Sequence, residues 1–82
     1  MSVYFFHLRD GLEMLADPDG REIDHVDHIA GIALREARAI IGHEAAAGTI
    51  YLDKHIHVAN ESGAIMHRLS FSDAVTIVAP GF

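Results

Sequence analysis

The sequence predicts an α+β protein with the element order β-β-α-β-β, in which a four-stranded antiparallel sheet carries one helix packed on one face. Three observations lead to this prediction. Residues 3–9 are strand-forming and end at a turn dipeptide, residues 25–47 repeat apolar side chains with helical spacing, and residues 54–59 and 64–71 alternate polar with apolar side chains. We expect the 82 residues, 1–82, to form a single domain.

The first two strands are predicted to form a hairpin. The opening run Val3–Arg9 is rich in aromatic and β-branched residues, and Asp10-Gly11 follows it directly. That dipeptide favours a two-residue type I′ turn, because both central positions of such a turn need a positive φ. Residues 12–16 can then return antiparallel to the first strand.

A second turn precedes the helix. Residues 17–20 read Asp-Pro-Asp-Gly, in which proline presets φ and glycine closes the turn, and residues 21–23 can add a short extended piece. Asp24 is the predicted N-cap, and Asp27 three residues later approximates a capping box. We therefore expect the helix to begin at about His25.

The predicted helix runs to about Ala47, and Gly48 is its expected stop. One stripe of the helix is apolar and is expected to face the sheet, with three alanines along its centre so that the helix can lie close to the strands. Its members are Val26, Ile29, Ala30, Ala33, Leu34, Ala37, Ile40 and Ile41. Ile32 falls outside this stripe and is expected to be exposed, either as an isolated surface residue or as a contact with a partner.

The second half of the chain predicts another hairpin. Residues 60–63 are a turn, and closing it with Ala59 opposite Ala64 places Ile56 opposite His67 and Val58 opposite Ile65. Ile65, Leu69 and Phe71 then share one face of the last strand. Residues 49–53 fit either a loop or a short extended segment. Residues 72–78 predict an extension or a last strand, and residues 78–82 a frayed tail.

The composition excludes several classes of function. The formal net charge is −6, from 12 acidic and 6 basic residues without a basic block, which disfavours nucleic-acid binding. The absence of cysteine excludes disulfides, thiolate metal sites and a cysteine nucleophile. No segment has the pattern of a signal peptide or a membrane span, so we expect a cytoplasmic protein without a membrane partner.

The order of motifs also resembles a known family. The opening Tyr4-Phe5-Phe6-His7-Leu8-Arg9-Asp10-Gly11 is followed by Asp17-x-x-Gly20-x-Glu22, by Ala33-x-x-Glu36-Ala37, and by Ile56-x-Val58, Gly63 and Leu69-x-Phe71-x-x-Ala74. This pattern is similar to a family of small proteobacterial domains of unknown function. The resemblance implies the fold and no activity. An aromatic residue expected just before the third strand is replaced here by Lys54-His55.

Histidines are the only candidates for a metal site. His55 and His57 share one face of a strand, and with His67 on the next strand they would supply three ligands for Zn²⁺. The expected register places His67 with Ile56 on the opposite face, and His25 with His28 is a weaker pair. We therefore predict no metal site.

Catalysis has equally little support. His7 with Asp10 or Glu13 could form an acid–base pair, but packing of His7 beside Phe5 is the simpler interpretation. Asp17 and Asp19 lack the further ligands of a calcium loop. The sequence has neither a nucleophile elbow nor a phosphate-binding loop, so we expect no catalytic residue, no cofactor and no enzyme activity.

The first strand predicts an interface, because it is apolar on both sides while only one helix is available to cover the sheet. The candidate interface residues are Tyr4, Phe5, Phe6, His7 and Ile32. The leading hypothesis is a non-enzymatic protein-interaction module that forms a homodimer. The alternatives are a regulatory, antitoxin-like component that masks a protein partner, and a metal- or pH-responsive protein built on the histidines.

Overall fold

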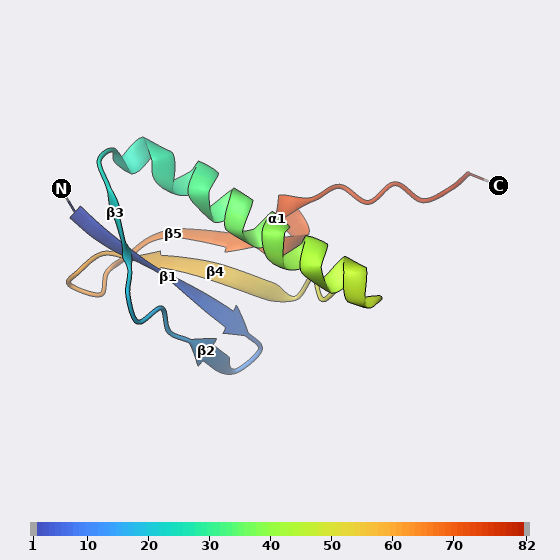
Figure 1. The fold of residues 1–82 in the computed structure, drawn as a ribbon, viewed down its shortest axis with the longest axis horizontal. Coiled ribbons are helices and arrows are strands. Elements are labelled where there is room, and N and C mark those ends of the chain that lie inside the picture. The colour runs from blue at the N-terminus through green and yellow to red at the C-terminus, as the bar shows by residue number, and fades with distance from the viewer. Residues whose placement is uncertain (1, 82) are drawn as a thin grey trace.

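A computed structural model describes residues 2–81 and confirms the α+β class. One antiparallel sheet has the strand order β2-β1-β4-β5, and β3 pairs with the other end of β1 (Figure 1). The elements are β1 Ser2–Asp10, β2 Glu13–Leu15, β3 Arg21–Ile23, the 3₁₀ turn η1 Val26–His28, α1 Ile29–Ala47, β4 Lys54–Ala59, β5 Ile65–Ser70 and α2 Phe71–Ala74. The short extended piece expected at residues 21–23 is thus a fifth strand.

The first hairpin forms as predicted but with a different turn. Asp10 pairs with Glu13, so Gly11 and Leu12 are the two central residues. Gly11 has a φ of 61°, and no non-glycine residue between positions 2 and 81 has a positive φ. The turn therefore fits type II′ rather than the expected type I′, because only its first central position is left-handed.

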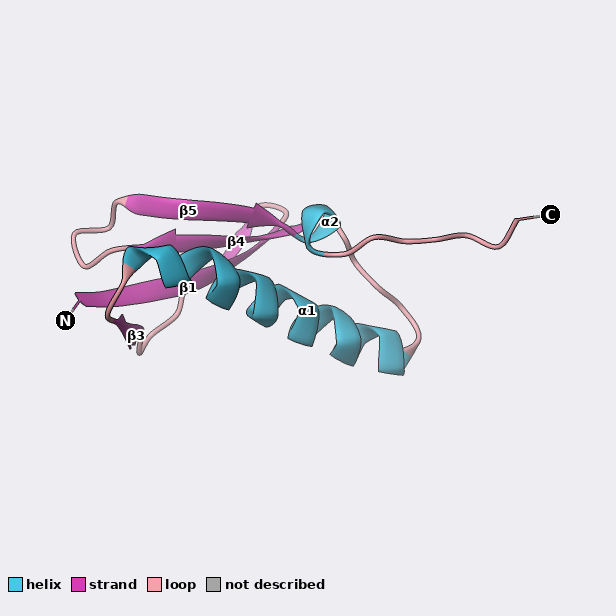
Figure 2. Ribbon diagram, turned by 90° about the horizontal axis from the view of Figure 1, so that it is seen from above, coloured by secondary structure: helices cyan, strands magenta, loops and turns pink. Residues whose placement is uncertain are grey.

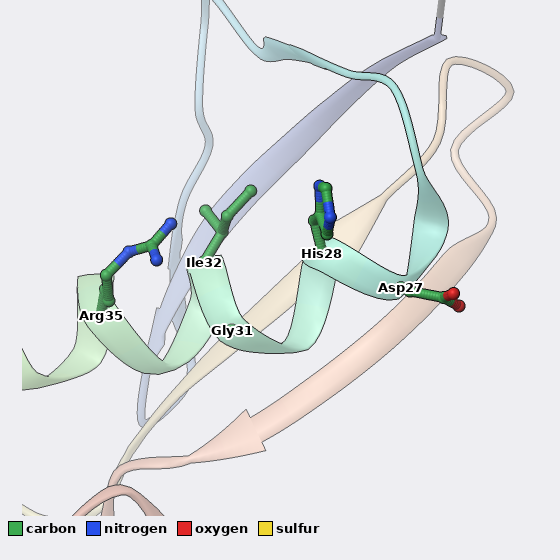
Figure 3. A pocket seen from close by; sticks show the side chains of 5 residues that line it. All are labelled: Asp27, His28, Gly31, Ile32 and Arg35. Atoms are coloured by element: carbon green, nitrogen blue, oxygen red, sulfur yellow. The ribbon is translucent and has the colours of Figure 1, made fainter.

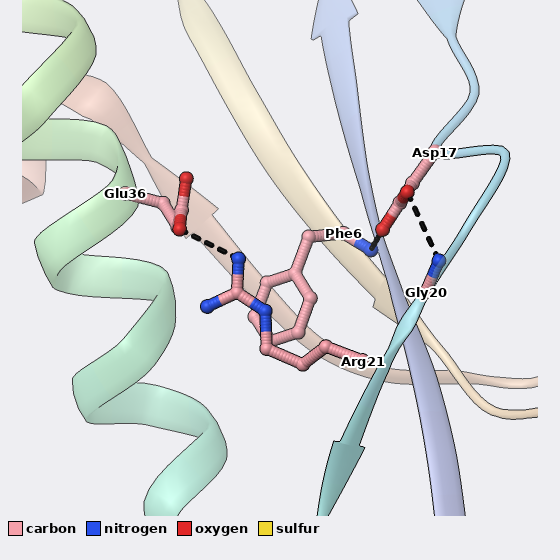
Figure 4. A network of polar contacts seen from close by, with 5 residues as sticks. All are labelled: Phe6, Asp17, Gly20, Arg21 and Glu36. Atoms are coloured by element: carbon pink, nitrogen blue, oxygen red, sulfur yellow. Dashed lines mark hydrogen bonds and ion pairs between the residues drawn. The ribbon is translucent and has the colours of Figure 1, made fainter.

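Asp17 holds the loop between β2 and β3 against β1. Its carboxylate accepts a hydrogen bond from the N–H of Phe6, at 3.1 Å, and two more from the N–H groups of Asp19 and Gly20 (Figure 4). Burial by itself would raise the pKa of Asp17, but these three hydrogen bonds and the nearby His7 outweigh it and lower the pKa. On this edge of β1, Phe6 lies between the residues that pair with β2 and those that pair with β3. The Asp17 carboxylate therefore supplies the acceptor that a neighbouring strand would otherwise supply to the N–H of Phe6.

Gly20 is needed where this loop meets β1. Its φ is 68°, and a Cβ atom placed on it would lie 2.7 Å from Val3 and 2.8 Å from the ring of Phe5. Only glycine satisfies both the left-handed backbone and the close approach. The Asp-Pro-Asp-Gly turn is therefore specified by its first and last residues.

The start of the helix differs from the prediction, whereas its end agrees. Asp24 does not cap it; the chain first forms η1, and α1 then begins after His28 without a side-chain cap. At the other end Gly48 is left-handed, its N–H bonds to the carbonyl of Ala45, and the N–H of Thr49 bonds to that of Glu44. This pair of hydrogen bonds is a Schellman motif.

The face of α1 that meets the sheet is rotated from the predicted stripe. The buried residues form one row at intervals of four, Ile29, Ala33, Ala37 and Ile41. Ala30 and Val26, expected in the stripe, are exposed, and Ile32, expected to be exposed, is half-buried against the core. Val26 lies in the 3₁₀ turn, whose tighter winding breaks the 100° spacing on which the prediction rested.

The register between β4 and β5 also differs from the prediction. Ile56 pairs with Leu69 and Val58 with His67, while Ala59 pairs with Ile65, so Met66 is an extra residue in a bulge. The turn is closed one position later than expected, by a hydrogen bond from the N–H of Asn60 to the carbonyl of Ala64. Because of the bulge, Ile65 turns to the face opposite the helix and is 39% exposed.

The end of the chain has a helical turn instead of the predicted last strand. α2 buries Phe71 and Ala74, three residues apart, and Arg38 of α1 donates a hydrogen bond from Nε to the carbonyl of Ala74 at 2.8 Å. Phe71 and Val58 are the largest fully buried side chains, so α2 completes the core beside β4. Residues 75–81 form no helix or strand and lead away from the sheet (Figure 2). Residues 49–53, left open by the sequence, are a loop.

Candidate functional site

One face of the sheet has no helix over it, and we call it the open face. The helix lies on a single side of the strands (Figure 2), where Tyr4, Ile56 and Val58 are buried. Side chains alternate across a strand, so the neighbouring positions point the other way. The open face consists of Val3, Phe5, His7 and Arg9 of β1, Met14 of β2, Glu22 of β3, His55, His57 and Ala59 of β4, and Ile65, Arg68 and Ser70 of β5.

Basic side chains occupy the centre of this face. In one row His7 pairs with His57, which pairs in turn with Arg68. In the next row Arg9 pairs with His55. The rings of His55 and His57 are 6.3 Å apart between centroids. The pairing of β1 with the hairpin of β4 and β5 thus brings three imidazoles and two guanidinium groups together.

His57 lies in the middle of this group. Burial lowers its pKa, and the charges of Arg68, Arg9, His55 and His7 lower it further. Every charged neighbour that shifts this pKa is basic. His57 is therefore mostly neutral at neutral pH, in a positive local potential.

His7 is held by a neighbour that sequence reasoning missed. The backbone N–H of Asp17 donates a hydrogen bond to Nδ1 of His7 at 2.9 Å, and the ring stacks on Phe5 with 6.3 Å between centroids. Since Nδ1 accepts, neutral His7 carries its proton on Nε2. Asp10, an acid–base partner considered from the sequence, has the parity of the opposite face and stands opposite Lys54 in the register of β1 and β4.

The predicted metal ligands do not converge. His55 and His57 lie on the open face, whereas His67 pairs with Val58 and has the parity of the helix side. The register of β5 differs from the expected one, but His67 again lies on the face opposite His55 and His57. Within residues 2–81 no three histidine or carboxylate side chains are grouped as a metal ion would need.

The five predicted interface residues do not form one surface. Tyr4 is buried in the core. Phe6 faces the helix side, with the guanidinium of Arg21 4.9 Å from its ring centroid (Figure 4). Ile32 is half-buried on α1. Phe5 and His7 lie together on the open face, where parity along β1 could also have located Arg9.

A recess lies along the start of α1, away from the open face. Its volume is about 420 Å³, and it is lined by Asp27, His28, Gly31, Ile32 and Arg35 (Figure 3). The side chains of His28, Ile32 and Arg35 point to one side, while that of Asp27 points away from them. Its polar lining groups are the imidazole of His28, the guanidinium of Arg35 and the carboxylate of Asp27, and the three do not converge.

The first hairpin exposes apolar side chains. Leu12 at the turn is 98% exposed and Leu15 of β2 is 59% exposed. β2 has only three residues and lies at the edge of the sheet. This hairpin is the second candidate for contact with another molecule.

These features define a small α+β domain whose sheet has one helix-covered face and one open, basic face. The chain belongs to the DUF6894 family, a domain of unknown function, whose model matches residues 3–72. The match extends from β1 into α2 and confirms that the resemblance is to a domain of unknown function. No curated protein and no solved structure matches the chain. None of the helices in residues 2–81 is both long and apolar enough to cross a membrane.

Proposed function

We propose that the protein is a non-enzymatic interaction module that forms a homodimer through its first hairpin. The observation that supports this proposal is the exposure of Leu12 and Leu15 on an edge strand. Exposed apolar side chains beside free strand hydrogen-bonding groups favour association. The first hairpin is also the segment for which the sequence predicts an interface.

Antiparallel pairing of β2 with the β2 strand of a second copy would form a symmetric contact. A two-fold axis at Met14 places Glu13 of each copy opposite Leu15 of the other, so the carboxylates do not oppose one another. The pairing would use the outer hydrogen-bonding groups of both edge strands and bury Leu12 and Leu15. The open face stays accessible in such a dimer.

Light scattering coupled to size-exclusion chromatography tests this proposal. We expect a mass of about twice 9.0 kDa for the natural protein. The Leu15→Asp variant should have the monomer mass, because it removes an apolar side chain from the contact and places a carboxylate opposite Glu13 of the other copy. The matched control is Ile77→Asp, since Ile77 is 69% exposed and lies beyond α2. A natural protein at 9.0 kDa, or a Leu15→Asp variant that remains dimeric, would contradict the hairpin dimer.

A further inference from the structure

The two arginines of the open face differ from most other basic residues of this acidic chain. Arg21 pairs with Glu36 at 2.7 Å, Lys54 pairs with Glu44 at 2.5 Å, and Arg38 binds a backbone carbonyl. Within residues 2–81, Arg9 and Arg68 form no ion pair with a carboxylate. A chain with 12 acidic residues thus leaves these two guanidinium groups uncompensated.

The histidines join the two arginines into one continuous patch of basic side chains. His57 separates Arg68 from His7, and His55 separates Arg9 from Ser70. No carboxylate stands among the paired positions of the open face in β1, β4 and β5. Such a surface lowers the free energy of a nearby anion.

We propose that the open face binds a short acidic segment of a partner protein, with Arg9 and Arg68 pairing with its carboxylates. This inference deepens the interaction function proposed above and rests on it, but it does not depend on the hairpin dimer. Phe5, Met14 and Ile65 border the basic patch and supply apolar contacts for the side chains between the carboxylates.

Two carboxylates at one end of the open face favour a peptide over a nucleic acid. Glu22 of β3 pairs with Val3 at that end, whereas Asp10 and Glu13 have the parity of the opposite face. Glu61 accepts a hydrogen bond from the N–H of Val3, at 3.2 Å. A continuous phosphate backbone would meet these two carboxylates on leaving the patch at that end, whereas a short acidic segment stops before them.

His57 makes the proposed binding depend on pH. The groups around it are His7 and Arg9 of β1, His55 of β4 and Arg68 of β5. Bound carboxylates would offset the repulsion of these basic groups and favour the protonated ring of His57, so binding takes up a proton. Affinity should therefore rise as the pH falls below about 6.5, the ordinary pKa of histidine.

Isothermal titration with an oligoglutamate peptide at about 50 mM salt tests the proposal, because low salt preserves surface electrostatics. Arg9→Gln and Arg68→Gln should each weaken binding by about threefold to fivefold, the range of a partly exposed ion pair. Arg35→Gln is the matched control, since Arg35 lines the recess on α1 away from this face, and we expect less than about a twofold change. Circular dichroism checks that each variant is folded.

Several outcomes would overturn the proposal. They are no binding of oligoglutamate, an equal loss in Arg35→Gln, and tighter binding of an oligothymidylate of the same length. The Leu15→Asp protein separates this proposal from the dimer. If it is monomeric and still binds the peptide, both proposals stand; if it is dimeric and binds, only the hairpin dimer fails.

Discussion

The backbone N–H of Asp17 donates a hydrogen bond to Nδ1 of His7 at 2.9 Å, while the Asp17 carboxylate accepts one from the N–H of Phe6. A single residue thus contacts β1 twice in the gap between β2 and β3. One contact satisfies the backbone of the strand, and the other orients an imidazole on the open face. The turn that follows β2 therefore positions part of the candidate binding surface.

Replacing Asp17 by alanine should destabilise the fold. The variant leaves the N–H groups of Phe6 and Gly20 without their acceptor, and a hydrogen bond to a charged group in a partly exposed site contributes about 1–2 kcal/mol. Urea denaturation would measure the change in the free energy of unfolding. Asp19→Ala is the control, because Asp19 contributes its N–H, and not its exposed carboxylate, to the turn. Equal losses in the two variants would contradict this role.

The stability of the protein should fall as the pH decreases below about 6.5, the ordinary pKa of histidine. His57 has a lowered pKa in the folded state, so the unfolded chain binds a proton at a pH where the folded protein does not. Its contribution is present above the unfolded pKa and is lost as the pH falls towards the folded pKa. Urea denaturation at several pH values should show a smaller loss for His57→Gln. Identical curves for the two proteins would exclude His57 as the cause.

Enlarging Ala33 should be costly, whereas enlarging Ala30 should not. Ala33 is fully buried between α1 and the sheet, and added side-chain volume in a packed core costs about 1–3 kcal/mol. Ala30 is exposed on the same helix, so Ala30→Leu should change stability by less than about 0.5 kcal/mol. Thermal unfolding of the two leucine variants would compare them. Equal costs in the two variants would restore the helix face predicted from the sequence, which includes both alanines.

Zinc should bind weakly at most. His67 has the parity of the helix side, and His7, His55 and His57 share the open face without being grouped as a metal ion needs within residues 2–81. Calorimetric titration of the protein without an affinity tag should therefore show no tight stoichiometric binding. Tight binding that disappears in the His57→Ala variant would show that a third ligand is present.

The elements that the sequence predicts correctly are those set by local chemistry. Asp10-Gly11 marks the first hairpin, and Gly48 ends the helix because a left-handed residue strongly favours glycine. Alternation identifies β4, where Ile56 and Val58 are buried, and most of β5, where His67 and Leu69 on the same side are half-buried. The class of fold follows from these elements and their order.

Contacts between distant segments decided the rest. The bulge at Met66 and the closure of the turn at Asn60 set the register of β5. A pattern of alternating polar and apolar residues does not show where a strand contains an extra residue. The sequence predicts an extension or a last strand over residues 72–78, but residues 71–74 form α2 because this turn buries Phe71 and Ala74 in the core.

Only the tertiary structure decided that His7 and Arg9 join His55, His57 and Arg68 in the basic patch. β1 lies far from β4 in the sequence, and the two strands become neighbours only through a pairing that depends on the free energy of the whole core.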